Sequence, residues 1–468
     1  MESIVNLLSQ FNSFAYGYYL VILLILVSVY YSFKLKFVQV SMLKEGFRVI
    51  AEKPDGKNDA LSSFQALAIS VASRVGIGNI AGIAIAVAVG GAGSVFWMWV
   101  MAFFGGASAF AESTLAQIYK SHDGDGFKGG PAYYIQKALN QHWFGALFAI
   151  TLILTYAFGF NGLQSYTMTS AFGVYYSDPS SFEGSSWTVI IGLLSSLIAT
   201  LLFFGKSTLI GKINAYVVPV MALFYIALAL IVTLMNLPLL PSVLADIFEK
   251  AFDFQAIFGG FAGSAVVIGI KRGLFATEAG MGSAPNAAAS AHTTHPVKQG
   301  LVQAISVLIG VLICSSTAFL VLFSQAYVEG GSTALPLVQK AMEEYFGSWG
   351  LHFVSVAVVC FAITSLLGNY YYAQANIKYL TDSKLVMKAF NVLAVAVVFV
   401  GSQMNLVLAW ELADVLMAVM ATLNIIAIFF LSDVVKTALN DYLDQKRAGL
   451  DPKFSATKLG IKNAECWE

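Results

Sequence analysis

Apolar runs of membrane-spanning length recur along the whole chain, and they restrict its fold more than any other feature. Of 468 residues, 58% are hydrophobic and 11% are charged, whereas soluble domains carry about 25% charged residues. About 20 apolar residues span the hydrocarbon core of a bilayer as a helix. Because backbone groups in lipid must form their hydrogen bonds within the span, we predict an all-α polytopic membrane protein.

The spacing of the apolar runs predicts eleven transmembrane helices. The first run has neither the basic start nor the cleavage site of a signal peptide, so we expect it to be a retained helix. The predicted spans are about 14–33, 61–91, 94–118, 144–172, 187–204, 213–237, 254–278, 299–328, 350–378, 387–402 and 406–432.

The basic residues between the spans predict the orientation of the chain. If the N-terminus is outside, the inside segments carry 23 of the 26 Lys and Arg residues. These segments are 34–60, 119–143, 205–212, 271–298, 378–388 and the tail from 433. Because cytoplasmic loops are enriched in Lys and Arg, we expect an extracytoplasmic N-terminus and a cytoplasmic C-terminus.

A glycine-rich stretch, SRVGIGNIAG (Ser73 to Gly82), interrupts the second run. A single helix over 61–94 would be ~51 Å long at 1.5 Å per residue, against a hydrocarbon core of ~30 Å. Gly76 and Gly78 lie about midway along the run, and glycine tolerates backbone conformations that end a helix. We therefore predict a broken membrane helix.

A second long segment, from Gly259 to Ala289, repeats this pattern, with glycines and a proline after an apolar start. Each broken helix opens a set of five spans, and an odd number of spans inserts the second set upside down. Inverted repeats with matching broken helices are typical of secondary transporters. A channel, a sensor or a receptor with kinked helices is the alternative. The predicted parts are an extra N-terminal helix and cytoplasmic linker (1–60), a first repeat (61–237), an extracytoplasmic linker (238–253), a second repeat (254–432) and a cytoplasmic tail (433–468).

Broken helices expose backbone groups that suit a zwitterion and a small cation. Half-helix N-termini carry partial positive charge, which favours a carboxylate, and freed carbonyl oxygens favour Na⁺. The spans contain no HExxH, GxSxG or paired catalytic aspartates, so we do not expect an enzyme. The three cysteines form no CxxC pair, and we expect neither a metal cluster nor a disulfide framework.

Three motifs resemble the alanine or glycine:cation symporter family: VGIGNIAGIAIAVAVGGAGSVFWMW (Val75 to Trp99), GGPAYYI (Gly129 to Ile135) and RGLFATEAGMGSAP (Arg272 to Pro285). The resemblance implies a LeuT-type fold of five plus five inverted spans, with one extra N-terminal helix here. It implies Na⁺ as the coupling ion, uptake of alanine, glycine or related neutral amino acids, and no organic cofactor. Proton coupling on the same fold is the alternative. A prokaryotic plasma membrane, a monomer or weak oligomer and no nucleic-acid partner are expected.

The resemblance also implies site residues. The predicted substrate-binding residues are Gly76, Gly78, Asn79, Gln164 and a second unwound segment comprising Gly273, Leu274, Phe275 and Ala276. The predicted sodium ligands are the carbonyls of Ala72 and Val75 and the hydroxyls of Thr364 and Ser365. Adjacent hydroxyls in an apolar run supply hard oxygen ligands, although they also bond back to carbonyls of their own helix in many membrane helices.

One departure from the family pattern predicts the substrate. In SLLGNYYYAQ, Asn369 stands where many members of the family carry a tryptophan against the substrate side chain. A carboxamide there removes an apolar wall and adds hydrogen-bonding groups, so we expect glutamine or a similar polar neutral amino acid to be accepted as well as alanine. The alternative is that Asn369 turns away and Tyr370 fills the space.

Charged residues inside the spans need partners. Arg74 lies ~20 Å into its span by helical rise. We expect it either to pair with Glu112 or Glu278, or to act beside the cation site in place of one sodium or on the substrate carboxylate. Lys271 and Arg272 are predicted at the cytoplasmic side of the site, as an inner gate or as anchors at a helix end.

Overall fold

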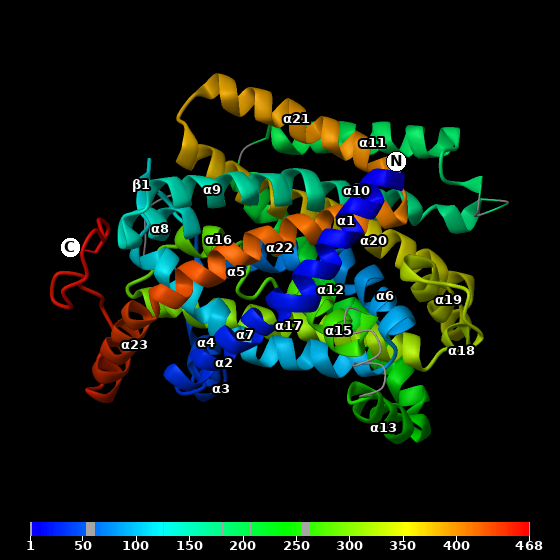
Figure 1. The fold of residues 1–468 in the computed structure, drawn as a ribbon, viewed down its shortest axis with the longest axis horizontal. Helices are drawn as coiled ribbons and strands as arrows, with labels where there is room; N and C mark the ends of the chain where they lie inside the picture. The colour runs from blue at the N-terminus through cyan, green and yellow to red at the C-terminus, as the bar shows by residue number, and fades with distance from the viewer. Residues whose placement is uncertain are drawn as a thin grey trace.

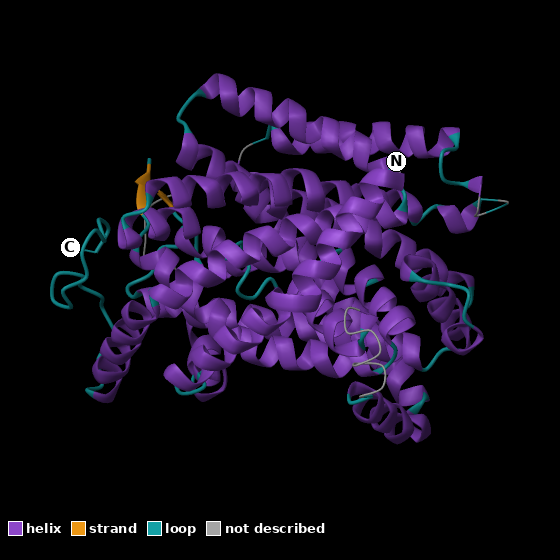
Figure 2. Cartoon of the chain, in the orientation of Figure 1, coloured by secondary structure: helices purple, strands orange, loops and turns teal. Residues whose placement is uncertain are grey.

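The long helices run side by side along the longest axis of the molecule, and the two termini lie at opposite ends (Figure 1). The computed structural model describes residues 2–52, 61–124, 126–176, 178, 181–205, 207–253 and 263–467. These residues are almost all helical (Figure 2). The strands among them are β1 (Ser121–Asp123) and β2 (Gly126–Lys128), which form one antiparallel hairpin at the C-terminal end of the molecule.

The helices follow the predicted runs. In the first half they are α1 (Glu2–Phe14), η1 (Ala15–Tyr19), α2 (Leu20–Lys34), α3 (Val38–Ser41), α4 (Leu43–Ile50), α5 (Ser63–Arg74), η2 (Ile77–Asn79), α6 (Ala81–Gly90), α7 (Gly93–Ile118), α8 (Pro131–Leu139), α9 (His142–Ile153), η3 (Leu154–Phe160), α10 (Asn161–Ser170), η4 (Gly173–Tyr175), α11 (Ser186–Phe203) and α12 (Ser207–Met235). In the second half they are η6 (Leu237–Leu239), α13 (Leu240–Ala251), α15 (Ala265–Thr277), α16 (Pro285–Ala289), α17 (Pro296–Leu322), α18 (Gln325–Glu329), α19 (Ala334–Phe346), α20 (Ser348–Leu380), α21 (Lys384–Ser402), α22 (Leu406–Phe430) and α23 (Ser432–Arg447).

Nine stretches of the described chain are long and apolar enough to cross a membrane, and the pair of α5 with η2–α6 makes a tenth with a bend of 56°. The predicted span 254–278 begins outside the described residues, so the count of eleven stays a prediction. The first span begins at Glu2 rather than near residue 14. Within this added part, Asn12 is buried and donates to the Glu411 carbonyl at 3.0 Å.

The centre of the bundle is formed by α7 and α17 with the broken helices. Every residue of α7 from Gly105 to Ile118 is buried, including Glu112. Gly300 of α17 allows close packing there, since a Cβ would lie 2.9 Å from the Phe110 carbonyl oxygen. The outer helices instead expose large apolar side chains, as at Leu201, which is 70% exposed. An exposed apolar surface of this extent marks a face that meets lipid.

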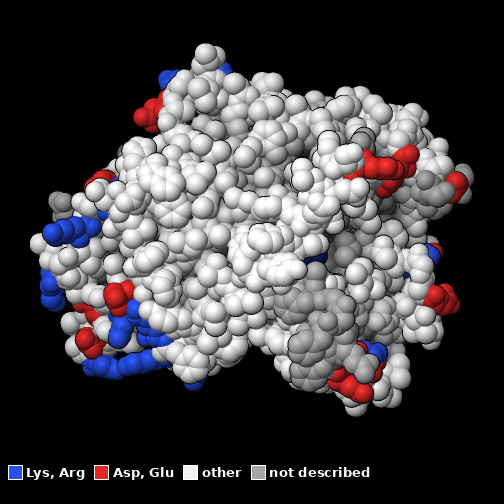
Figure 3. Space-filling model, in the orientation of Figure 1, with Lys and Arg blue, Asp and Glu red and all other residues white. Residues whose placement is uncertain are grey.

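Charge is concentrated at the two ends of the molecule (Figure 3). Basic side chains gather at the end that holds the C-terminus, acidic ones predominate at the opposite end, and the face between is almost uncharged. An uncharged belt between two charged ends matches a protein that spans a bilayer.

Candidate functional site

The first broken helix turns at Gly76. The α5 helix ends at Arg74 and α6 begins at Ala81. Gly76 is extended, with φ −121° and ψ −157°. A Cβ on Gly76 would lie 2.5 Å from Ser365 Oγ and 2.8 Å from Gln164 Nε2. Side chains of α10 and α20 therefore approach the broken backbone so closely that only glycine fits at this position.

The second broken helix unwinds later than predicted. Residues 273–276 (Gly273, Leu274, Phe275 and Ala276) are helical, in the last turn and a half of α15, so the prediction that they are unwound is wrong. The chain turns instead through the left-handed residues Glu278 (φ 52°), Gly280 (φ 81°) and Gly282 (φ 86°). Gly273 serves packing, since a Cβ there would lie 3.2 Å from Met98 Cα of α7.

One face of α10 carries polar side chains from an open cavity to the first break. Asn161, Gln164 and Thr167 are one turn apart, and all three are buried. Asn161 Nδ2, Gln164 Oε1 and Thr167 Oγ1 have no hydrogen-bond partner among the described residues. Each such buried group costs about 1–3 kcal/mol. Thr167 lines a cavity of about 370 Å³, whose wall includes Ala81 and Trp410. This face of α10 is therefore suited to a polar ligand that enters from the cavity.

Three aromatic rings separate this cavity from the break. The Phe275 ring covers Gly78, where any Cβ would overlap it. The ring centroids of Phe160 and Phe275 are 4.7 Å apart, and those of Phe275 and Trp410 are 5.3 Å apart. Because Trp410 also lines the cavity, one layer of rings closes this side of the site.

The structure brings two of the predicted sodium ligands together. Ser365 Oγ donates to the Ala72 carbonyl at 2.9 Å. Val75, the third predicted ligand, caps α5 at the start of the break. The Thr364 hydroxyl, in contrast, donates to carbonyls of its own helix, those of Cys360 at 3.1 Å and Phe361 at 3.0 Å. Hydroxyl and carbonyl oxygens are the ligands that hard cations prefer.

Asn79 is held between the break and α17. Its side-chain Nδ2 donates to the Gly310 backbone carbonyl at 3.2 Å, and its backbone carbonyl accepts from Thr317 Oγ1 at 2.7 Å. Asn79 Oδ1 is buried without a partner among the described residues. It therefore adds an unpartnered acceptor to those on α10.

Asn369 faces the site rather than turning away. Its Oδ1 lies 2.9 Å from Ser73 Oγ, and its Nδ2 donates to Asn161 Oδ1 at 3.0 Å. Tyr370 points to the opposite side, where its hydroxyl donates to the Phe203 carbonyl at 3.0 Å and its ring stacks on that of Phe203 at 4.4 Å. Tyr370 therefore does not fill the space beside Asn369.

Arg74 links the two breaks through Glu278. Arg74 is 1% exposed, and its Nε lies 3.8 Å from Glu278 Oε2. Its Nη1 donates to Ser306 Oγ of α17. Glu112 has other partners, since its Oε2 accepts from the Gly282 backbone N–H at 3.1 Å and from Asn424 Nδ2 at 2.7 Å. Both buried glutamates therefore hold the second break in place, and Arg74 pairs with only one of them.

Lys271 and Arg272 lie within α15, before the second break, and not in a loop between spans. The charge pattern assigns 271–298 to an inside segment, but the first of these residues belong to the helix, and the side of the membrane that they face stays a prediction. Arg272 binds Asp414 of α22 at 3.2 and 2.8 Å, and Lys271 Nζ lies 2.6 Å from Asp414 Oδ2. The Arg272 guanidinium also lies 4.2 Å from the centroid of the Trp410 ring. These charges therefore support the aromatic layer beside the cavity.

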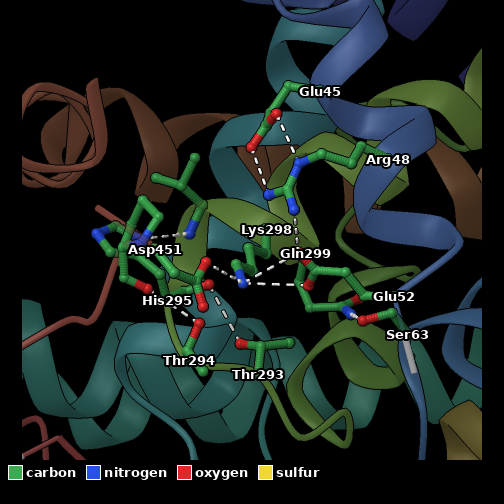
Figure 4. Close-up of polar contacts among 12 residues, drawn as sticks. Glu45, Arg48, Glu52, Ser63, Thr293, Thr294, His295, Lys298, Gln299 and Asp451 are labelled. Atoms are coloured by element: carbon green, nitrogen blue, oxygen red, sulfur yellow. Dashed lines mark hydrogen bonds and ion pairs between the residues drawn. The ribbon is translucent and has the colours of Figure 1, made fainter. Parts of the chain in front are cut away.

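A polar network closes the other end of the first broken helix (Figure 4). Ser63, at the start of α5, accepts from Gln299 Nε2 of α17 at 2.9 Å. Next to it, Lys298 binds Glu52 at 3.1 Å and Asp451 of the C-terminal segment at 3.2 Å. Any opening at this end therefore requires several ion pairs and hydrogen bonds to separate.

Comparison with known proteins identifies the family. The sequence profile of the sodium:alanine symporter family matches residues 1–456. The chain belongs to this family. It is 45% identical to a probable sodium/glutamine symporter, GlnT, of Bacillus subtilis (strain 168), over 97% of this chain and 94% of that protein. It is 41% identical to the amino-acid carrier protein AlsT of the same organism, over 100% of this chain and 99% of that protein. A sodium:alanine symporter family member with these long apolar helices is a multi-pass membrane protein, as predicted.

A solved structure shares the fold. The crystal structure of MhsT in complex with L-phenylalanine superposes with a TM-score of 0.57 at 15% identity, over 87% of this chain and 96% of that chain. This similarity supports the predicted LeuT-type fold over the superposed part of the chain, while the eleven spans and the five-plus-five repeat stay predictions.

Several residues at the site escaped the sequence reasoning. Asn161 and Thr167 flank the predicted Gln164 at helical spacing, and that spacing could have found them. Trp410 lies far along the chain in LAWELAD. The carboxylate of Asp414 in the same apolar span is visible in the sequence as a charge that needs a partner, but its pairing with Lys271 and Arg272 is not.

Proposed function

We propose that this chain is a sodium-coupled symporter that imports small neutral amino acids by alternating access, with alanine and glycine as substrates and glutamine as a further candidate. The observation that carries the proposal is the polar face of α10, which runs from an open cavity to a glycine break held against Ser365. Membership of the sodium:alanine symporter family supports the coupling ion.

In this proposal the amino acid binds across the first break. Its carboxylate meets the backbone at Gly76 and Gly78, and Asn79 and Gln164 bind its polar groups. Half-helix N-termini favour such an anion. The last residues of α15 (Gly273, Leu274, Phe275 and Ala276) lie over the ligand, with the Phe275 ring as its cover, and Asn369 contacts its side chain.

The proposed sodium site is formed by the Ala72 and Val75 carbonyls with the Ser365 and Thr364 hydroxyls. The distance of 2.9 Å between Ser365 Oγ and the Ala72 carbonyl supports it. Thr364 retains free lone pairs on its hydroxyl oxygen while donating to its own helix, and so still offers a ligand.

The proposed architecture keeps the predicted parts: an extra helix and linker (1–60), two inverted repeats of five spans (61–237 and 254–432) joined by a linker (238–253), and a tail (433–468). Eleven spans in the plasma membrane place the N-terminus outside and the C-terminus in the cytoplasm. The gathering of basic side chains at the C-terminal end supports this orientation (Figure 3). We take the working unit to be a monomer or weak oligomer.

Two gates follow from this orientation. The outer gate is the ring layer of Phe275 and Trp410 with the Arg272–Asp414 ion pair, and the inner gate is the network around Lys298. Opening each in turn exposes the same site to either face. Glu112, Glu278 and Arg74 hold the two breaks in register between the gates.

Sodium supplies the driving force. Each Na⁺ that enters down a potential of 100 mV contributes ~2.3 kcal/mol, which supports roughly a 50-fold accumulation of a neutral substrate.

The test is uptake of labelled alanine into proteoliposomes of the purified chain, driven by an inward sodium gradient or, separately, by an inward proton gradient. We expect uphill uptake with sodium and none with protons alone. Uptake that follows the proton gradient and ignores sodium would replace the proposal with proton coupling.

A further inference from the structure

Two asparagine side chains meet beside the substrate site. Asn161 of α10 and Asn369 of α20 are both fully buried. Asn369 Nδ2 donates to Asn161 Oδ1 at 3.0 Å, while Asn161 Nδ2 has no partner among the described residues. A carboxamide offers two N–H donors and an oxygen with two lone pairs. One hydrogen bond between the two amides therefore leaves most of their capacity unused.

The oxygen of Asn369 is also only partly satisfied. Ser73 Oγ lies 2.9 Å from Asn369 Oδ1 and 2.8 Å from Glu278 Oε1. A hydroxyl has one hydrogen to donate, and a carboxylate is the stronger acceptor. Ser73 therefore donates to Glu278, and Asn369 Oδ1 is left to accept from another group.

Both orientations of the two amides leave hydrogen-bonding groups free. A rotation of 180° exchanges the nitrogen and oxygen of each side chain. If both amides turn, Asn369 Nδ2 donates to Ser73 Oγ and Asn369 Oδ1 accepts from Asn161 Nδ2. Asn161 Oδ1 is then free. In either orientation the pair presents at least one free N–H and one free oxygen to a ligand.

The position of the pair matches the end of a substrate side chain. Asn161 lies three residues along α10, ~4.5 Å of helical rise, from Gln164, whose amide approaches Gly76. A ligand anchored at Gly76 by its α-carboxylate reaches the pair only with a side chain longer than a methyl group. The pair contacts Ser73 but no Lys or Arg among the described residues. The Ser73 hydroxyl connects it to the Glu278 carboxylate, which pairs with Arg74.

We propose that Asn161 and Asn369 form a receptor for the side-chain carboxamide of the substrate, which makes this chain selective for glutamine over glutamate. The carboxamide oxygen accepts from one asparagine, and its NH₂ group donates to the other. A glutamate side chain offers no donor and brings a second negative charge towards Glu278. This inference rests on the proposed function and adds the side-chain class that the site recognises.

Competition against labelled alanine uptake tests it. We expect unlabelled glutamine to inhibit uptake at least tenfold more strongly than glutamate, because a buried site built for hydrogen bonds rejects a ligand that leaves them unmade. In the double variant Asn161→Leu/Asn369→Leu, which replaces both partners by apolar groups of similar shape, we expect glutamine inhibition to weaken at least tenfold. The effect is measured as the ratio of glutamine inhibition to alanine self-competition in the same variant.

The control is Asn391→Ala, which removes another buried amide, bonded to the Tyr370 hydroxyl at 2.9 Å on the side of α20 away from the site. It should leave the ratio of glutamine to alanine inhibition unchanged. Equal inhibition by glutamine and glutamate, or full glutamine inhibition in the double variant, would overturn the inference while leaving sodium-driven alanine uptake, and thus the proposed function, intact.

A second measurement covers the case in which the double variant does not fold. In sodium buffer, glutamine should raise the thermal unfolding midpoint of the unmodified protein and glutamate should not. Equal shifts with the two ligands would contradict the carboxamide receptor. Loss of sodium dependence in alanine uptake would instead count against the proposed function alone.

Discussion

Removal of the Ser365 hydroxyl should weaken sodium binding more than removal of any other hydroxyl on α20. Ser365 Oγ lies 2.9 Å from the Ala72 carbonyl, directly against the glycine at the break. In Ser365→Ala the ion loses one neutral oxygen ligand. Gly76 keeps its place, because alanine is smaller than serine and relieves rather than adds crowding.

The expected magnitude follows from the loss of one hydroxyl contact to the charged ion. A hydrogen bond to a charged group contributes about 1.5–3 kcal/mol, and a contact of that strength corresponds to roughly a 10- to 150-fold loss of sodium affinity. The assay is alanine uptake into proteoliposomes at a series of sodium concentrations. We expect the half-saturating sodium concentration to rise within that range, with near-normal uptake at saturating sodium.

Two neighbouring hydroxyls make the comparison specific. Thr364 donates to its own helix, so Thr364→Val should raise the half-saturating sodium concentration less than Ser365→Ala does. Ser355 bonds the Leu351 carbonyl at 3.0 Å, far from the break, and Ser355→Ala should leave sodium dependence unchanged. The reasoning is refuted if Ser365→Ala shows the sodium dependence of the unmodified protein, or if Ser355→Ala impairs it equally.

Three further predictions concern stability. Asp414→Asn leaves the buried Arg272 and the half-buried Lys271 without their carboxylate, and should lower the free energy of unfolding by about 3–5 kcal/mol. Asp246→Asn, in an exposed ion pair, should cost at most about 1 kcal/mol. Thermal unfolding in detergent compares the two variants, and equal losses would contradict the dependence on burial. Gly280→Ala places a Cβ at φ 81° and 2.8 Å from Ile425, and should cost about 1–3 kcal/mol in the same assay. Burial lowers the pKa of His295 to about 4, below the ordinary value of about 6.5. The unfolded chain therefore binds the extra proton first, so stability is full above pH 6.5 and falls as the pH drops towards 4. His295→Asn should flatten this decline of stability with falling pH. If the variant's stability falls with pH as that of the unmodified protein does, His295 is not its cause.

The sequence predicted the features that depend on local chemistry. Apolar runs of fixed length gave the membrane helices, and Gly76 and Gly78 marked the first break within the correct turn. The contact between Ala72 and Ser365 followed from the resemblance to the family, because a shared fold places the same backbone and helix positions together.

The sequence reasoning failed where tertiary packing decides what a residue does. Gly273, Gly280 and Gly282 look alike in the sequence, but of the three only Gly280 and Gly282 have positive φ. Gly273 instead allows α7 to pack closely against α15. Lys271 and Arg272 read as an inner gate or as anchors at a helix end, and their common partner Asp414 lies 142 residues after Arg272. Asn161 was missed because its significance arises from Asn369 on another helix.

The most direct test of the account is the entry of labelled Na⁺ into proteoliposomes in the presence and absence of alanine. If one break holds both ligands and moves them together, alanine should accelerate sodium entry in the unmodified protein. In Gly76→Ala, where a Cβ displaces Ser365 and Gln164, that acceleration should be lost. Sodium entry that is the same with and without alanine, in a preparation that still accumulates alanine, would contradict the coupled site.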